Sequence, residues 1–183
     1  MRSLIAALSF LLSSAVMSGE PEKKVIKTPD GEVHTTTTTV EPVAQKIVAV
    51  SREDIKTFNA YATQGPSFVS AYIPKVKSPT LKDFDEAFRL WQNEKKPRYT
   101  QQQVIEILGA HLGNTLAKDL DMEWVVVTDE YGTDYAVRGK KYEAMSFPFS
   151  SVMKRIESNE HEFMFGVYHT IKTSIKDGEC MKR

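Results

Sequence analysis

Cysteine is almost absent from this sequence of 183 residues, whose single example is Cys180. One cysteine forms no disulfide within its own chain, so the fold must be held by packing. Cys180 could pair between chains or react as a thiol. It lies in a polar tail with no second cysteine or histidine beside it, which favours an incidental residue.

Net charge is also lacking, because 24 basic residues balance 24 acidic ones. The basic residues are scattered along the chain and form no stripe or block. A balanced, dispersed charge gives no long-range attraction to nucleic acid or to an anionic membrane surface. We therefore expect neither as a partner.

Long hydrophobic runs are missing except at the start, where residues 1–18 place Arg2 before a short apolar stretch and end on small residues. This order is typical of a cleavable secretory signal. The run is shorter than the roughly 20 apolar residues of a membrane span, although an uncleaved anchor is the alternative. We predict cleavage after Ser18, or else after Ala15, and a protein that is periplasmic or secreted, with no membrane span after signal removal.

The rest of the chain divides by composition. Residues 19–50 are polar and threonine-rich, and they predict either an extended spacer or a weak hairpin around Pro29-Asp30-Gly31. Residues 51–176 have the apolar content of a single domain, and residues 177–183 form a polar tail.

Helical periodicity dominates the first half of that domain. Ser51 resembles the cap of a first helix, and Gly65-Pro66 is typical of its end. Ser78-Pro79 predicts the start of a second helix, and Thr100 predicts the start of a third. The second of these helices carries an aromatic stripe that could line a ligand pocket, although core packing explains it better: Leu81, Phe84, Phe88 and Trp91.

The helix after Thr100 contains Gly109 and Gly113, which lie four residues apart on one face. Glycine within a helix costs about 0.5–1 kcal/mol relative to alanine. Two glycines on one stripe predict that a strand or another helix approaches this surface closely.

Three short strands follow, at residues 122–128, 133–138 and 142–147, with turns around Gly132 and Gly139. Short connections predict antiparallel neighbours. Phe147-Pro148 then opens a helix that ends at Asn159, and a last helix spans about 160–176. The fold class is therefore α+β: helices packed on a small three-strand antiparallel meander, with helices before and after the strands.

The stretch from Leu108 to about Ile156 resembles a bacterial family known only as domain of unknown function 3806. The residues that carry the resemblance are Leu108-Gly109, Leu112-Gly113, 122–127, 129–132, 134–138, Phe147-Pro148-Phe149 and Lys154-Arg155. The resemblance implies this fold and a bacterial origin, but no established activity and no assigned catalytic residue.

Motifs for common chemistries are lacking as well. The four histidines have no metal-binding spacing, no serine lies in a Gly-x-Ser-x-Gly turn, and no glycine-rich phosphate loop occurs. We expect no metal and no cofactor. The only polar cluster that could perform acid–base work is the predicted 129–134 hairpin, with Asp129, Glu130 and Asp134, together with His111. Ordinary turn chemistry explains the acids better.

Two functions remain open. The first is a noncatalytic binding or protein-interaction domain in the bacterial envelope, with a protein as its partner. The second is a small hydrolase that uses the hairpin acids with His111, which requires those side chains to converge in one pocket. The lack of a catalytic signature favours the first, and nothing in the sequence indicates the oligomeric state.

Overall fold

The computed structural model describes residues 22–28, 31–37 and 44–178 and divides them into two units. The smaller unit contains an antiparallel hairpin in which β1 (Glu22–Thr28) pairs with β2 (Gly31–Thr37), with Val25 opposite His34. The signal segment 1–18, Pro29-Asp30 of the expected turn, and Cys180 lie outside the described residues.

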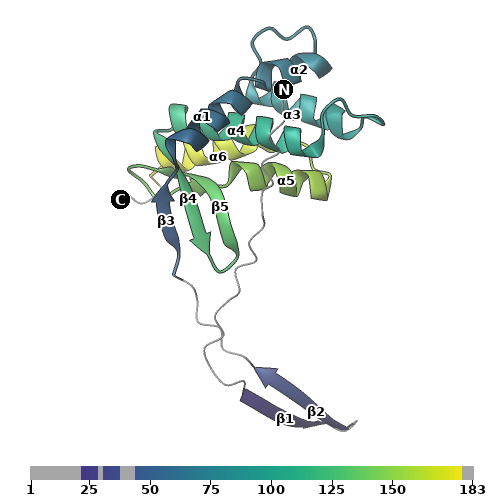
Figure 1. Cartoon of the computed structure of the whole chain (residues 1–183), viewed down its shortest axis with the longest axis vertical. Helices are drawn as coiled ribbons and strands as arrows, with labels where there is room; N and C mark the ends of the chain where they lie inside the picture. Colours follow the sequence, from purple (N-terminus) through teal and green to yellow (C-terminus); the bar gives the residue numbers. More distant parts are fainter. Residues whose placement is uncertain (1–21, 29–30, 38–43, 179–183) are drawn as a thin grey trace, which may run out of the picture. The chain divides into compact units, whose positions relative to one another are not determined.

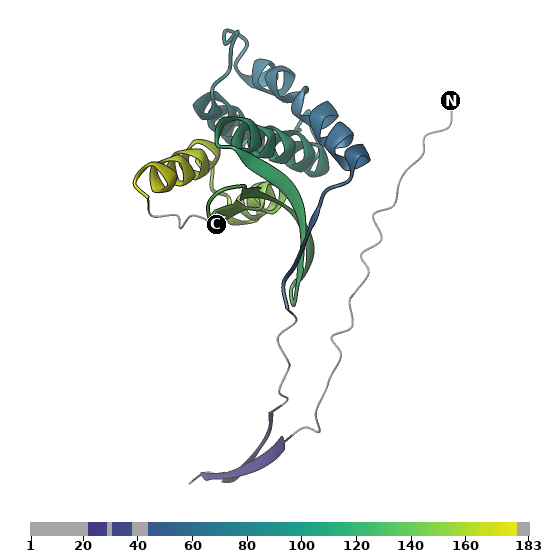
Figure 2. The same ribbon diagram turned by 90° about the vertical axis from the view of Figure 1, so that its left-hand side faces the viewer.

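The larger unit begins with a strand and contains six helices and four strands. In chain order these are β3 (Lys46–Ala49), α1 (Arg52–Ala62), α2 (Gly65–Tyr72), α3 (Leu81–Gln92), α4 (Gln101–Asp119), β4 (Met122–Asp129), β5 (Gly132–Gly139), β6 (Met145–Ser146), α5 (Pro148–Ser158) and α6 (Met164–Lys176). Strands β3, β4 and β5 lie side by side and extend away from the helices (Figures 1 and 2). The predicted α+β class, with helices before and after the strands, is confirmed.

The sheet has four strands in the order β3-β4-β5-β6, one more than the expected meander. The additional strand, β3, pairs antiparallel with β4 and places Ile47 opposite Val127. The predicted third strand, 142–147, is reduced to β6, because residues 140–144 turn back on themselves. There the Gly139 N–H donates to the Ala144 carbonyl at 2.8 Å, and the Tyr142 hydroxyl donates to the Leu120 carbonyl.

Two of the expected helix starts are confirmed, since Ser51 caps α1 and Thr100 caps α4. The start proposed at Ser78-Pro79 is wrong by two residues. Thr80 is the N-cap of α3, because the Asp83 carboxylate accepts both its backbone N–H at 2.7 Å and its hydroxyl at 2.6 Å. Gly65-Pro66 begins α2 as well as following α1, in keeping with the fixed φ of proline at a first helical turn.

Helix α4 lies at the centre of the larger unit, in contact with α1, α5, α2 and α6. The predicted close approach to its glycines is confirmed. A Cβ placed on Gly109 would overlap Phe149 of α5, and one placed on Gly113 would overlap the Trp124 indole of β4. The bare backbone of α4 therefore allows a helix and a strand to pack directly against it.

The aromatic stripe of α3 is core, as expected, because Phe84, Phe88 and Trp91 are all buried. It shares one large apolar cluster with α4, with Trp124 and Val137 of the sheet, and with the start of α6. Among the described residues, no helix combines the length and the apolarity that crossing a membrane requires.

Candidate functional site

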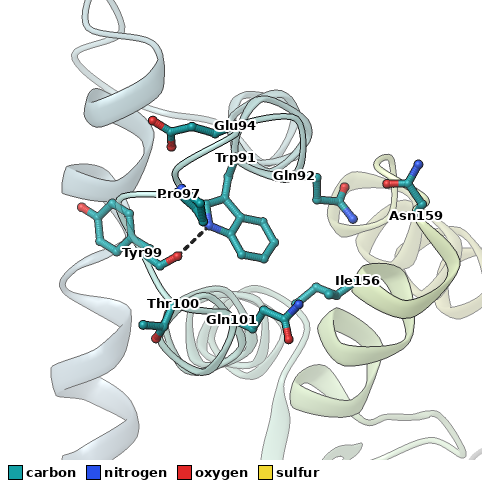
Figure 3. Close-up of a pocket in the computed structure, with 9 residues that line it drawn as sticks. All are labelled: Trp91, Gln92, Glu94, Pro97, Tyr99, Thr100, Gln101, Ile156 and Asn159. Atoms are coloured by element: carbon teal, nitrogen blue, oxygen red, sulfur yellow. Dashed lines mark hydrogen bonds between the residues drawn. The ribbon is translucent and has the colours of Figure 1, made fainter.

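One hollow of about 230 Å³ lies where the end of α3, the 93–100 loop, the start of α4 and the end of α5 meet (Figure 3). We call it the Trp91 hollow. Its lining residues are Trp91, Gln92, Glu94, Pro97, Tyr99, Thr100, Gln101, Ile156 and Asn159.

Trp91 forms the apolar floor of the hollow. The helical spacing of α3 buries this residue, which is 4% exposed. Its indole N–H donates to the Tyr99 carbonyl at 2.9 Å, which ties the 93–100 loop back onto the helix (Figure 3). A buried tryptophan needs such a partner for its N–H. The hydrogen bond therefore fixes both the ring and the rim of the hollow.

Three side-chain amides surround this floor, and they differ in their hydrogen bonds. Gln92 is held at both ends: its amide nitrogen donates to the Arg155 carbonyl at 3.1 Å, and its oxygen contacts His161 Nδ1 at 2.5 Å. Gln101 and Asn159 have no side-chain hydrogen-bond partner in the described part of the chain, although both line the hollow. Two amides thus remain able to bind a ligand.

The acid on the rim is already engaged. The Tyr72 hydroxyl donates to Glu94 at 2.8 Å, and Arg98 forms an ion pair with the same carboxylate at 3.4 Å. The hydrogen bond from Tyr72 is the largest cause that lowers the pKa of Glu94. Burial, followed by this hydrogen bond, raises the pKa of Tyr72. Glu94 is therefore an ionised, paired group with no feature of a proton donor.

The acids suggested by the sequence lie in and beside the β4–β5 hairpin. Asp129 Oδ1 accepts the Tyr131 N–H at 2.9 Å, which is ordinary turn chemistry, and Glu130 is exposed in the turn. Asp134 lies on β5, where it accepts the Tyr135 N–H at 2.7 Å and the hydroxyl of Ser150.

His111 lies on α4, with its ring stacked on Phe84 at a centroid separation of 4.0 Å. Burial lowers the pKa of this histidine, while a hydrogen bond to the Ala62 backbone opposes the shift. No hydrogen bond between described residues joins His111 to any of the three acids. None of the four lines the Trp91 hollow. The catalytic hypothesis for them stays a prediction.

In the described ranges, no group of three or more histidine, cysteine, aspartate and glutamate side chains is arranged to hold a metal ion. Of the residues that line the Trp91 hollow, the sequence suggested only Trp91, as part of the aromatic stripe of α3, and it did not indicate the amides around it. Gln101, the first of three consecutive glutamines, and Asn159 lie at the ends of two helices, 58 positions apart in the numbering. The sequence did predict that α5 ends at Asn159, and the structure confirms this with a left-handed backbone at that residue (φ 54°).

Residues 83–168 match the family described as "Domain of unknown function (DUF3806)". The expected resemblance to this family is confirmed over these residues. The DUF3806 match extends the resemblance from Leu108–Ile156 outward into α3 and α6. It includes every residue that lines the Trp91 hollow.

Among proteins with curated descriptions, none matches the chain significantly. A crystal structure from Bacteroides thetaiotaomicron VPI-5482 has a similar fold, with a TM-score of 0.52 and 13% sequence identity. The similarity covers 75% of this chain and 51% of that one, so this chain spans about half the length of its structural relative. At this identity the likeness shows the fold alone.

Proposed function

We propose that this protein is an exported, noncatalytic binding domain of the bacterial envelope, and that its partner is a protein. The observation that carries the proposal is the Trp91 hollow, in which two amides without hydrogen-bond partners among the described residues stand around an apolar floor. Each amide offers both a donor and an acceptor, as a peptide group does. Gln101 and Asn159 can therefore satisfy the backbone of a bound chain.

The size of the hollow favours a protein partner over a small molecule. Small-molecule sites commonly occupy roughly 300–1,000 Å³, whereas this hollow has about 230 Å³. It has room for one anchoring side chain with its flanking peptide groups. Protein interfaces concentrate their binding energy on such central anchors.

The binding role can be tested with a matched pair of variants on α4. Gln101 and Gln102 are adjacent, exposed glutamines, but only Gln101 lines the hollow. We expect Gln101→Trp to fill the hollow and to reduce recovery of a specific envelope partner about tenfold, the effect of 1.4 kcal/mol. Gln102→Trp should recover the partner as the wild type does. Equal recovery by both variants, or loss with both, would overturn this assignment of the hollow.

Export is supported by the order of charge, apolar run and small residues in 1–18. Fractionation of cells that produce the full chain, followed by N-terminal sequencing, tests it directly. We expect a periplasmic or secreted protein that begins at Gly19, or at Val16 if cleavage follows Ala15. A cytoplasmic protein that retains the first 18 residues contradicts the proposal.

A further inference from the structure

A second hollow, of about 360 Å³, lies between α3 and the start of α6, and we call it the α3–α6 cleft. Its lining shares no residue with that of the Trp91 hollow. The side chains of α3 that line this cleft recur at helical spacing, so they share one face of that helix. The lining residues are Lys82, Asp85, Glu86, Arg89, His161, Glu162, Phe165 and Gly166.

Asp85 brings a buried negative charge to this cleft. The residue is 6% exposed, and its carboxylate accepts the backbone N–H groups of Phe163, Met164 and Phe165 at 3.2, 2.9 and 3.1 Å. Burial raises the pKa of Asp85 in spite of these hydrogen bonds. No basic side chain forms an ion pair with it in the described part of the chain. A nearby cation would therefore stabilise its charged form.

In its neutral form His161 brings a hydrogen-bond acceptor, because its contact with Gln92 fixes which ring nitrogen carries the proton. Because the Gln92 nitrogen donates to the Arg155 carbonyl, the Gln92 oxygen faces His161 and must accept a proton from Nδ1. A neutral imidazole with a proton on Nδ1 has a lone pair on Nε2. That nitrogen has no hydrogen-bond partner among the described residues, and His161 lines the cleft.

The remaining charges leave the cleft with an excess of negative charge. Arg89 is engaged by Glu86, with two N–H···O contacts of 2.7 and 2.6 Å, so this pair is neutral as a unit. Lys82, Asp85 and Glu162 complete the charged lining, so one ammonium group accompanies two carboxylates. The Lys82 ammonium lies 4.5 Å from the centre of the Phe165 ring, which shows that the ring face accepts a cation.

We propose that the α3–α6 cleft binds the ammonium or guanidinium group of a basic side chain from a polypeptide partner. The N–H groups of that cation donate to His161 Nε2 and to the Glu162 carboxylate, and the negative charge of Asp85 attracts it. The cation shares or replaces the position of Lys82 over the Phe165 ring. This is a second site, and it can be occupied whether or not the Trp91 hollow binds anything.

An anionic ligand fits the same cleft poorly. The backbone N–H groups that open α6 are already used by Asp85, and the Arg89 guanidinium is already paired with Glu86. An anion would therefore meet only Lys82, beside two carboxylates of its own sign. Like-charge contacts of this kind disfavour binding.

The test is an NMR titration of the ¹⁵N-labelled chain with four blocked amino acids: the N-acetyl amides of arginine, lysine, citrulline and glutamate. We expect the arginine or lysine amide to produce saturable shifts at residues 161–166. The citrulline amide, which keeps the shape of arginine without its charge, should bind about tenfold more weakly, as the loss of one charge-assisted contact implies.

A matched pair of variants places the site. Glu160 and Glu162 are both exposed acids of the α5–α6 connection, but only Glu162 lines the cleft, while Glu160 pairs with Arg155 at 2.9 Å. Glu162→Gln should weaken arginine or lysine amide binding about tenfold, and Glu160→Gln should leave it unchanged. Saturable binding of the glutamate amide, equal binding of citrulline, no saturable shift with any probe, or an unaffected Glu162→Gln variant each overturns the proposal.

Discussion

The Trp124 indole lies so close to Gly113 that a Cβ on the glycine would overlap the ring. We predict that Gly113→Ala destabilises the protein by about 1–2 kcal/mol, since overpacking costs roughly 1–3 kcal/mol and the better helix propensity of alanine returns up to about 1 kcal/mol. Chemical denaturation followed by circular dichroism measures the change.

Gly166 provides the control for that substitution. It also lies within a helix, but a Cβ placed on it has no neighbouring atom within 4 Å. Gly166→Ala should therefore stabilise the protein by roughly 0.5–1 kcal/mol. If Gly113→Ala raises the midpoint as Gly166→Ala does, helix propensity outweighs the contact with Trp124 and the packing argument is wrong.

A second prediction concerns the polar end of the same indole. The Trp124 N–H donates to Asn114 Oδ1 at 3.0 Å, and the Asn114 amide nitrogen donates to Asn59 at 2.9 Å. Asn114→Leu leaves the buried indole N–H without an acceptor, which costs about 1–3 kcal/mol. Asn59→Ala removes only the exposed end of this chain and should cost less than about 0.5 kcal/mol. Equal losses of stability in the two variants would show that the hydrogen bond from the indole does not provide the main stabilisation.

The sequence predicted those features of the fold that depend on neighbouring residues. The caps at Ser51 and Thr100 follow from a hydroxyl beside a helical pattern, and the glycines of α4 signalled a close neighbour before that neighbour was known. The strand at Lys46–Ala49 escaped prediction because it is short and largely exposed, so its place depends on the distant partner β4.

The candidate sites were beyond prediction for the same reason. Asp85 reads as an ordinary acid in the first half of a helix, yet its carboxylate caps α6 about 80 positions later in the chain. Gln92 and His161 are separated by 69 positions and meet only in the folded chain. Patterns in a single sequence reveal contacts between residues that are close along the chain. These contacts join residues that are far apart along it, so no pattern predicts them.

A third prediction follows from this distant cap. The start of α6 has no side-chain cap of its own, so Asp85 satisfies three N–H groups that would otherwise be unpaired. We expect Asp85→Ala to lower the free energy of unfolding by at least about 2 kcal/mol, the scale of losing a cap and leaving buried donors. The adjacent Glu86→Ala breaks only an exposed ion pair and should cost less than about 1 kcal/mol. Hydrogen exchange should also accelerate first at the start of α6.

A fourth prediction concerns the pH dependence of Asp85. Burial raises its pKa above the ordinary 3.8, so the folded protein holds this proton at pH values where the unfolded chain has lost it. Its contribution to stability therefore falls as pH rises from about 3.8 through the raised pKa, and it is constant above that range. The difference in unfolding free energy between wild type and Asp85→Asn should shrink across this window. A difference that grows with pH would show that the three N–H groups outweigh burial.

The fifth prediction gives the opposite sign for His111. Burial against Phe84 lowers the pKa of this histidine below its ordinary 6.5, so the unfolded chain takes up a proton before the folded protein does. Its contribution to stability is fully present above pH 6.5 and is lost as pH falls below 6.5 toward the lowered folded pKa.

His111→Gln keeps an N–H for the Ala62 carbonyl but does not titrate, so unfolding free energies measured between pH 7 and 5 should decline less steeply in this variant. An unchanged slope in His111→Gln would mean that this histidine takes up its proton equally well in the folded protein, and that its stacking on Phe84 does not favour the neutral ring.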